Sequence, residues 1–430
     1  MNATHTNCVF PVNNFNSVKE NILNWISRFG IFVFLDNHRY QLTPHTQEVL
    51  AAAGCKESVN GNAGNMLAVL QYQLNKNKSW WFGHLGYDLK NEIESLSSGH
   101  PDRVGFPDLF FFRPQVIIRM GDGYIEIDGK NPQKIFSEIV SGKNNGNDSI
   151  AHQVDIRPRI SKEEYISAVN RLRRHILRGD CYEINFCQEF FSEEAVIDPL
   201  AVYKSLSAVS PNPFSAFYRV KDAYLLCASP ERFLKKSGNQ IISQPIKGTS
   251  VRFPSNTEKD LISKINLSES EKDKSENVMV VDLVRNDLSK ICKEGSVKVT
   301  ELFGVYSFPQ VHQMISTISG ELEKDIDFKK IIFATFPMGS MTGAPKKRVM
   351  ELIETYEKTK RGIFSGAVGY ISPEGDFDFN VVIRSIMYNA ASRYLSFQAG
   401  SGITFNSDPE KEYEECLLKA GVLNKIFEKK

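Results

Sequence analysis

The sequence predicts a mixed fold of helices and strands with substantial sheet, of the α/β or the α+β class, and three observations support this. The chain has 430 residues, enough at roughly 150 residues per domain for two or three domains or one large intertwined fold. Short runs rich in β-branched and aromatic residues, typical of strands, recur along the chain. Between and after them lie segments with helical apolar spacing and helix start signals. Helices packed on sheet around a sizeable core are therefore expected.

The first region of the chain, residues 1–140, mixes one predicted helix with several predicted strands. The helix is at 18–29, and the strand-like runs are 30–36, 114–120 and 124–129. A polar segment rich in Gly and Asn follows at 141–153 and is interpreted as a linker at the surface. The sequence therefore predicts a second region at 154–430.

The second region has sharper signals. Ser161 and Glu164 form a capping-box pattern ahead of apolar residues at helical spacing, and Gly179 ends the predicted helix. The strand-like runs that follow are 182–191, 214–220, 223–229, 366–372, 381–389 and 394–400. Helices are expected between and after these runs, in keeping with the mixed class.

The last predicted helix has the clearest start. Asp408 is a good N-cap, and Pro409 suits the first helical position. The residues expected on one charged face are Glu412, Glu415, Lys419 and Val422. The residues expected to form an apolar row beside it are Leu418, Val422 and Ile426. We expect the charged row to border a buried site.

Composition argues against several classes of protein. Lysine and arginine number 52 against 51 acidic residues, so no net field favours nucleic acid or an anionic membrane. No apolar stretch approaches the roughly 18 residues of a membrane span, and the start of the chain lacks the pattern of an export signal. Seven scattered cysteines contain no CxxC pair of a zinc or redox site. We therefore expect a cytoplasmic protein with reduced thiols that acts on a small molecule.

Several single residues could carry chemistry, and each also has an ordinary structural explanation. Glu276 opens a helix, where an acid is more often solvated than a ligand. His312 would by default be a satisfied interior or edge histidine. The glycines of "QAGSGIT" either make a bend after a strand or let backbone N–H groups approach an anion. Glu276 and Glu415 offer the oxygen ligands that Mg²⁺ prefers, although the pattern alone does not show that they meet.

The segment "GSMTGAPKKR" has the glycines of a phosphate loop but not its ending. Pro345 precedes Lys346, and Lys347 follows it, so the Lys-Ser/Thr pair of a P-loop is missing. We therefore reject nucleotide binding.

Motifs along residues 155–428 match one enzyme family together and in order. They include "PIKGT", "SENVMVVDLVRNDL", "FPQVHQMIST", "GSMTGAPK" and "EYEECLLKA". In these segments the chain resembles the chorismate-utilising enzymes, the group of anthranilate synthase component I, aminodeoxychorismate synthase component I and the isochorismate synthases. The resemblance implies an α+β fold of two intertwined α/β sandwich subdomains, with curved antiparallel sheets around a buried site. Residues 1–140 also resemble the family's N-terminal portion.

One residue within "PIKGT" separates the branches of this family. Anthranilate synthases usually have alanine there and aminodeoxychorismate synthases lysine, and the chain has Lys247. The resemblance therefore implies a transferase that replaces the C4 hydroxyl of chorismate by an amino group, which gives 4-amino-4-deoxychorismate, the precursor of p-aminobenzoate and folate. Anthranilate synthase component I is the alternative, and a non-catalytic regulatory subunit of the same fold is a remote one.

Two further residues bear on these branches. Phe364 stands where anthranilate synthases tend to have tyrosine, which weakly disfavours that branch. Glu183 stands where isochorismate-forming relatives use a lysine to activate water, which counts against a water nucleophile.

The resemblance also implies catalytic roles. Glu231 is the expected general acid for the leaving hydroxyl and needs a raised pKa, which burial near other carboxylates would favour. Lys247 is the expected nucleophile and needs a neutral amine, obtained by desolvation or by nearby positive charge. His312 is the third expected catalytic residue, with a positioning role.

Binding roles follow from the same resemblance. Glu276 and Glu415 are the expected ligands of Mg²⁺, with Glu412 as an acid behind them. The residues expected to bind the carboxylates of the substrate and their surroundings are Gly248, Thr249, Ser340, Arg384, Gly400, Ser401, Gly402 and Lys419.

Chorismate and ammonia are the expected reactants. No cysteine lies in the Gly-flanked nucleophile elbow of a glutaminase, so a separate glutamine amidotransferase subunit, component II, is the expected partner. No lyase domain is recognised in the sequence, so conversion to p-aminobenzoate is expected to need another enzyme.

Overall fold

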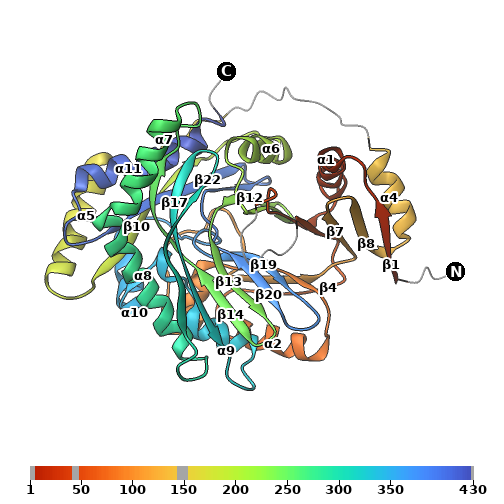
Figure 1. Cartoon of the computed structure of the whole chain (residues 1–430), viewed down its shortest axis with the longest axis horizontal. Helices are drawn as coiled ribbons and strands as arrows, with labels where there is room; N and C mark the ends of the chain where they lie inside the picture. Colours follow the sequence, from red (N-terminus) through yellow and green to blue (C-terminus); the bar gives the residue numbers. More distant parts are fainter. Residues whose placement is uncertain (1–4, 41–47, 143–153, 428–430) are drawn as a thin grey trace.

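The structure is a computed structural model that describes residues 5–40, 48–142 and 154–427. Two large sheets and the helices that cover them make up this part of the chain (Figure 1). Every strand pair found in the two sheets is antiparallel. The predicted mixed fold is confirmed as an α+β fold with antiparallel sheets.

The first sheet combines strands from the beginning, the middle and the end of the described chain. In spatial order its strands are β1 (His5–Pro11), β8 (Tyr124–Lys130), β7 (Val116–Gly121), β3 (Val49–Ala53), β2 (Ile31–Asp36), β11 (Phe214–Val220), β12 (Ala223–Ser229), β21 (Ser385–Asn389), β22 (Tyr394–Ile403), β10 (Glu183–Ser192) and β18 (Gly343–Ala344), while β9 (Arg157–Pro158) also pairs with β10.

The second sheet lies across from the first. In spatial order its strands are β15 (Ile246–Val251), β17 (Val311–Glu321), β14 (Gln240–Gln244), β13 (Arg232–Ser237), β20 (Phe377–Asn380), β19 (Ala367–Ile371), β5 (Trp81–Leu85), β6 (Leu109–Arg113) and β4 (Glu57–Gly61), while β16 (Lys298–Ser307) also pairs with β17.

Strands from the two predicted regions share both sheets. In the first sheet β2 pairs with β11, and in the second β5 pairs with β19. The regions are thus intertwined, as the resemblance implied. The predicted linker 141–153 lies outside the described residues from position 143 onward, and the division into 1–140 and 154–430 stays a prediction.

Helices surround the sheets. They are α1 (Phe15–Ile26), α2 (Met66–Lys76), α3 (Lys90–Glu94), α4 (Pro132–Val140), α5 (Lys162–Leu177), α6 (Pro199–Val209), α7 (Thr257–Glu269), α8 (Glu271–Ser289), α9 (Phe328–Thr335), α10 (Lys346–Tyr356) and α11 (Pro409–Asn424), with 3₁₀ turns η1 (Tyr87–Leu89) and η2 (Gly339–Met341). Within the described ranges, none of these helices is long and apolar enough to cross a membrane.

Two apolar cores hold the layers together, and β2 shows how. Side chains alternate along a strand, and Phe32 and Phe34 join the core under α1, α4, α5, α6, α10 and α11. Val33, between them, joins the other core, which includes the second sheet with α2, α8 and α9. The first sheet is therefore buried on both faces.

The strongest helix signals in the sequence are confirmed. Ser161 accepts a hydrogen bond from the Glu164 N–H, and the Glu164 side chain accepts one from the Ser161 N–H, so the predicted capping box starts α5. Asp408 caps α11 by accepting from two backbone N–H groups.

The predicted apolar row of α11 is wrong. Leu418 is 69% exposed, and Val422 and Ile426 are only partly buried. The buried residues of the helix are Glu412, Cys416, Ala420 and Leu423. Small side chains let α11 approach the sheet closely, so the buried face is turned away from the larger Leu418.

Two strand predictions also need correction. The predicted strand 381–389 begins only at Ser385, because Arg384 has φ of +50° and leaves the extended conformation. The predicted bend in "QAGSGIT" is a strand, since β22 continues to Ile403 alongside β10. A Cβ atom at Gly400 would lie 1.9 Å from the Phe186 carbonyl oxygen, so glycine here permits close strand contact.

Candidate active site

Lys247 of β15 reaches across to β10 of the other sheet. Its Nζ donates a hydrogen bond of 2.5 Å to Glu183 Oε1, and the two side chains are 11% and 5% exposed. Burial alone would lower the pKa of Lys247, but the carboxylates of Glu183 and Glu276 outweigh it and raise this pKa above its ordinary value. This direction favours the protonated amine, whereas the expected nucleophile needs a neutral one.

Gly402 makes room for this ion pair. It lies on β22 opposite Asn185 of β10. A Cβ atom added to it would lie 2.7 Å from Lys247 Nζ and 2.7 Å from Glu183 Oε1. Any larger residue at this position would therefore displace both charged groups.

Glu231 lies just before β13 and is 4% exposed. Ser340 Oγ donates a hydrogen bond of 2.6 Å to Glu231 Oε1. Burial raises the pKa of Glu231 to about 7, although Ser340, Lys247 and Arg384 act in the opposite direction. The expected rise is therefore present, but its cause is burial and not neighbouring carboxylates. Ser340, expected to bind substrate, contacts the candidate acid.

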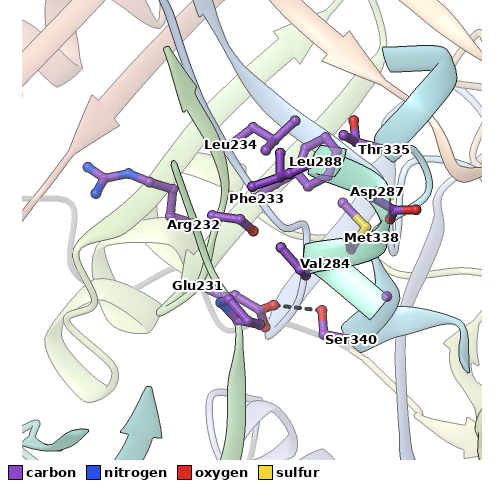
Figure 2. Close-up of a pocket in the computed structure, with 13 residues that line it drawn as sticks. Glu231, Arg232, Phe233, Leu234, Val284, Asp287, Leu288, Thr335, Met338 and Ser340 are labelled. Carbon is purple, nitrogen blue, oxygen red and sulfur yellow. Dashed lines mark hydrogen bonds between the residues drawn. The ribbon is translucent and has the colours of Figure 1, made fainter. Parts of the chain in front are cut away.

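A small cavity extends beside the Glu231 carboxyl, lined by residues of β13, α8 and the η2 turn. Figure 2 shows Val284, Leu288 and Met338 above the hydrogen bond between Glu231 and Ser340. These side chains make the wall beside the carboxyl mostly apolar. Surroundings of this kind favour the neutral, protonated form of an acid.

Arg384 lies near the same acid. Burial lowers the pKa of its guanidinium to about 10, and the charge of Glu231 opposes this effect. In the part of the chain that the structure describes, the Arg384 side chain has no hydrogen bond or ion pair. A guanidinium in this position suits a carboxylate ligand, which is consistent with the expected contact to substrate.

Gly248 lies in a bulge of β15, and Thr249 follows it. The register with β17 shifts between Ile246 and Thr249, and Gly248 has φ of +92°, which favours glycine. A bulge takes residues out of the strand pairing, so the Gly248 N–H can serve another acceptor, whereas Thr249 is paired with Gln313 of β17. This geometry is consistent with the expected backbone contact to a carboxylate.

Glu276 of α8 and Glu415 of α11 belong to one group of charges. Burial raises the pKa of Glu276 to about 7; Lys247 opposes the rise, and the carboxylates of Glu183 and Glu415 add to it. Burial would also raise the pKa of Glu415, but Lys419, whose Nζ lies 2.8 Å from Glu415 Oε1, lowers it below its ordinary value.

The donors at this point fit a magnesium ion. Carboxylate oxygens are its preferred protein ligands, and three acids, Glu276, Glu412 and Glu415, raise the pKa of Lys272 although burial would lower it. Lys272 Nζ lies 3.8 Å from Glu276 Oε1. Among the described residues, no three metal-ligating side chains are grouped closely enough to hold an ion by themselves. A cation here would need further oxygen ligands from water and substrate.

Lys419 and Ser401 do not both face the site. Lys419 Nζ donates a 2.9 Å hydrogen bond to the Gly400 carbonyl oxygen, in addition to its pair with Glu415. The Ser401 side chain is 2% exposed and lies near Tyr165 on the opposite face of β22. The backbone of Ser401 is paired with Phe186 of β10, so the geometry does not support the expected substrate contact of this residue.

His312 is engaged elsewhere. It is fully buried on β17, with Ser307 Oγ 2.9 Å from Nδ1 and Asp260 Oδ1 3.2 Å from Nε2. Both ring nitrogens therefore have protein partners other than Lys247 and Glu231. The geometry matches the satisfied interior histidine and lends no support to a catalytic role.

Sequence reasoning missed two contacts of the site. Glu183 is the partner of Lys247, but the two residues lie 64 positions apart on different sheets, so no spacing rule joins them. Lys346 forms a buried ion pair with Asp287 that ties α10 to α8 beside the cavity. A signal was available, because all four residues stand inside motifs of the family resemblance.

Comparison with known proteins assigns the chain to a family. The sequence profile of the family described as chorismate binding enzyme matches residues 36–425. The chain therefore belongs to the family of chorismate-binding enzymes.

Two relatives have related names. Aminodeoxychorismate synthase, chloroplastic, of Arabidopsis thaliana is 42% identical over 368 residues, which cover 79% of this chain and 39% of that protein. Aminodeoxychorismate synthase component 1 of Escherichia coli (strain K12) is 33% identical over 352 residues, which cover 81% of this chain and 76% of that protein. The chain spans only about two fifths of the first curated relatives it matches, with shares of 43%, 39% and 37%.

A solved structure shares the fold. Anthranilate synthase component I from Streptococcus pneumoniae TIGR4 superposes with a TM-score of 0.78 at 24% sequence identity, covering 90% of this chain and 95% of that chain. At this identity the likeness shows the fold alone, and it agrees with the fold that the sequence motifs implied.

Proposed function

We propose that the chain aminates chorismate at C4 and forms 4-amino-4-deoxychorismate. The observation that carries this proposal is a buried lysine, Lys247, placed in the electrostatic reach of a buried acid, Glu231. A residue with a short apolar side chain at position 247 would offer no nucleophile. The names of the Arabidopsis and Escherichia coli relatives point to the same reaction.

Glu231 is the proposed acid for departure of the C4 hydroxyl. With a pKa of about 7, a substantial fraction of the carboxyl is protonated at neutral pH and can deliver a proton to the leaving oxygen. The hydrogen bond from Ser340 holds Oε1 in place. Lys247 is the proposed nucleophile at C2, and ammonia then attacks C4 and expels the lysine.

The two carboxylates of chorismate need partners in a buried site, because unpaired charge there is costly. We assign the enolpyruvyl carboxylate chiefly to Arg384, together with Lys419 and the N–H groups of residues 400–402. We assign the ring carboxylate to the N–H groups of Gly248, in the bulge of β15, and of Thr249, which follows it.

Mg²⁺ is the proposed cofactor, held by Glu276 and Glu415. When bound, the ion neutralises the ring carboxylate. Glu412, on the buried side of α11 and 3% exposed, can orient water or a ligand behind it.

The ammonia is proposed to come from a separate glutamine amidotransferase subunit. The Escherichia coli relative is named component 1, and such a name suggests a second component. The cysteines of the described residues are all free thiols, five of them buried, and none stands in the sequence pattern of a glutaminase nucleophile.

Incubation of the purified chain with chorismate, Mg²⁺ and an ammonium salt tests the proposal. The expected product is 4-amino-4-deoxychorismate, identified by mass spectrometry. The Lys247→Ala variant is expected to bind chorismate, measured by calorimetry, but to form no 4-amino product. Formation of fluorescent anthranilate would favour the anthranilate branch instead, and absence of any turnover would favour a regulatory subunit.

A further inference from the structure

A protonated Lys247 has no free electron pair, so a base must remove a proton before the nitrogen can attack carbon. Acids face the lysine from four elements: Glu183 on β10, Glu276 on α8, Glu415 on α11 and Glu231 before β13. One of these carboxylates is the natural acceptor of the proton.

Contacts distinguish the four acids. Glu231 accepts from Ser340 and must itself carry a proton for the leaving oxygen. Glu415 is paired with Lys419, and Glu276 lies next to Lys272. Glu183 alone among the four has a hydrogen bond to the Lys247 ammonium in the described part of the chain.

We propose that Glu183 is the base that takes the proton from Lys247 as the lysine attacks the substrate. The inference rests on the proposed amination of chorismate, and it adds to that reaction a catalytic residue in direct contact with the nucleophile.

The step balances in protons and electrons. The Lys247 ammonium gives a proton to the Glu183 carboxylate, and the freed nitrogen pair forms a bond to C2. The two ring double bonds each shift by one position, the C4–O bond breaks, and the oxygen leaves as water with the proton of Glu231. Ammonia then bonds to C4, the double bonds return, and the C2–N bond breaks. The departing amine recovers its proton from Glu183, and the new ammonium at C4 gives one to Glu231.

The surroundings of Glu183 suit a carboxylate that accepts a proton better than one that serves only as a fixed counter-ion. Its carboxylate has no other hydrogen bond among the described residues. Glu189, on the same strand and equally buried, is held instead by Arg159 and by the Tyr394 hydroxyl. Protonation of Glu189 would leave Arg159 without its charged partner, whereas Glu183 can accept a proton without leaving an arginine unpaired. Gly402, by leaving space at the pair, keeps donor and acceptor in contact.

The first test needs no turnover. The rate at which acetic anhydride modifies Lys247, followed by peptide mass spectrometry across a pH series, reports the ionisation of the amine. Glu183→Gln is expected to shift the midpoint to lower pH by more than tenfold in proton concentration, because a neighbouring anion is lost. The matched control Glu189→Gln is expected to leave the midpoint in place. An unchanged midpoint in Glu183→Gln would overturn the proposal.

The second test is the pH profile of kcat/KM for amination with an ammonium salt. Loss of a general base typically costs 10²-fold to 10⁴-fold, and Glu183→Gln is expected to show such a loss at pH 7 with its ascending limb moved to higher pH. Glu183→Asp is expected to keep the ascending limb of the wild type and to recover part of the rate. A Glu183→Gln profile with the wild-type rate and limbs contradicts the role as base. If the wild type itself makes no amino product, the proposed function fails, and the modification experiment still decides whether Glu183 controls the lysine.

Discussion

Burial acts on the pKa of several charged residues of the site, and the charges that surround each residue decide the direction of its net shift. It raises the pKa of Glu231 and of Glu276 to about 7. Burial would lower the pKa of Lys247, yet nearby carboxylates hold the amine in its protonated form. Burial lowers the pKa of Arg384 to about 10, and the charge of Glu231 opposes this lowering. These pKa shifts therefore come from contacts between residues far apart in the chain.

Glu231→Gln is expected to lose most turnover but to stabilise the fold at alkaline pH. The carboxyl has an ordinary pKa of 4.5 and a folded pKa of about 7, so the folded state binds more protons than the unfolded state between these values. Its contribution to stability therefore falls as pH rises from about 4.5 to 7. At full ionisation the cost is about 3 kcal/mol, and a neutral amide avoids it.

Thermal unfolding between pH 5 and 9 and turnover at pH 7 check this expectation. The variant is expected to melt above the wild type at pH 8, with a 10²-fold to 10⁴-fold loss of rate. Equal melting temperatures at every pH would show that Glu231 is not destabilised by its surroundings.

At the scale of an element, β22 uses glycine for two purposes. A Cβ atom at Gly400 would strike the Phe186 backbone oxygen at 1.9 Å, so this glycine permits strand pairing. A Cβ atom at Gly402 would meet only the ends of two side chains, Lys247 and Glu183, at 2.7 Å. The first glycine therefore serves the fold, and the second serves the site.

The pair of variants Gly400→Ala and Gly402→Ala is expected to separate stability from activity. Gly400→Ala forces backbone apart and is expected to lose about 3 kcal/mol or more of unfolding free energy. Gly402→Ala displaces flexible side-chain ends, so it is expected to fold with a melting temperature near that of the wild type and to lose at least tenfold in turnover. Denaturant unfolding and amination rates measure the two effects. A Gly402→Ala protein that is fully active would show that the ion pair beside it has no role in the reaction.

At the scale of the whole molecule, the site exists only where distant segments meet. The two sheets contribute one partner each to the ion pair of Glu183 and Lys247. Helices α8 and α11, both on the left in Figure 1, come from the middle and the end of the described chain. They bring Glu276 and Glu415 into electrostatic contact. A ligand that bridges these segments is expected to stabilise the whole fold.

Mg²⁺ is therefore expected to raise the melting temperature of the wild type. Binding only to the folded state at a hundredfold excess over Kd adds about 2.7 kcal/mol. The increase is expected to vanish with EDTA and to be lost in Glu276→Gln. Glu414→Gln, a change at an exposed acid of α11, serves as the matched control and is expected to respond like the wild type. An equal response of Glu276→Gln would place the ion elsewhere.

Local sequence signals predicted the elements well wherever the determining interactions are local. The capping box at Ser161 and the cap at Asp408 are closed within a few residues, and both helices start as expected. The predictions failed where a partner far along the chain decides. The glycines after Gln398 remain a strand because β10 pairs with them, and Leu418 is exposed because small neighbours on α11 pack instead.

For the site as well, the sequence indicated which residues take part but not which of them are in contact. The motifs located Lys247, Glu231, Glu276, Glu415 and Arg384 by resemblance, without their distances. The resemblance also suggested His312, whose nitrogens are in fact occupied by Ser307 and Asp260. Neither periodicity nor motif spacing reports which side chain faces which, because that depends on how two sheets are placed across each other.

The sequence by itself determined the class of fold, the starts of α5 and α11, several strands and, by family resemblance, the residues proposed to carry the chemistry, since these depend on local periodicity, capping and motifs. Only the tertiary structure decided that Lys247 is paired with Glu183 and that Glu231 is buried against an apolar wall. It also decided that the charges of Glu276 and Glu415 lie close enough to interact. The physical reason is that desolvation and charge–charge interaction depend on distance in space, and residues of different sheets and helices acquire that distance only when the chain has folded.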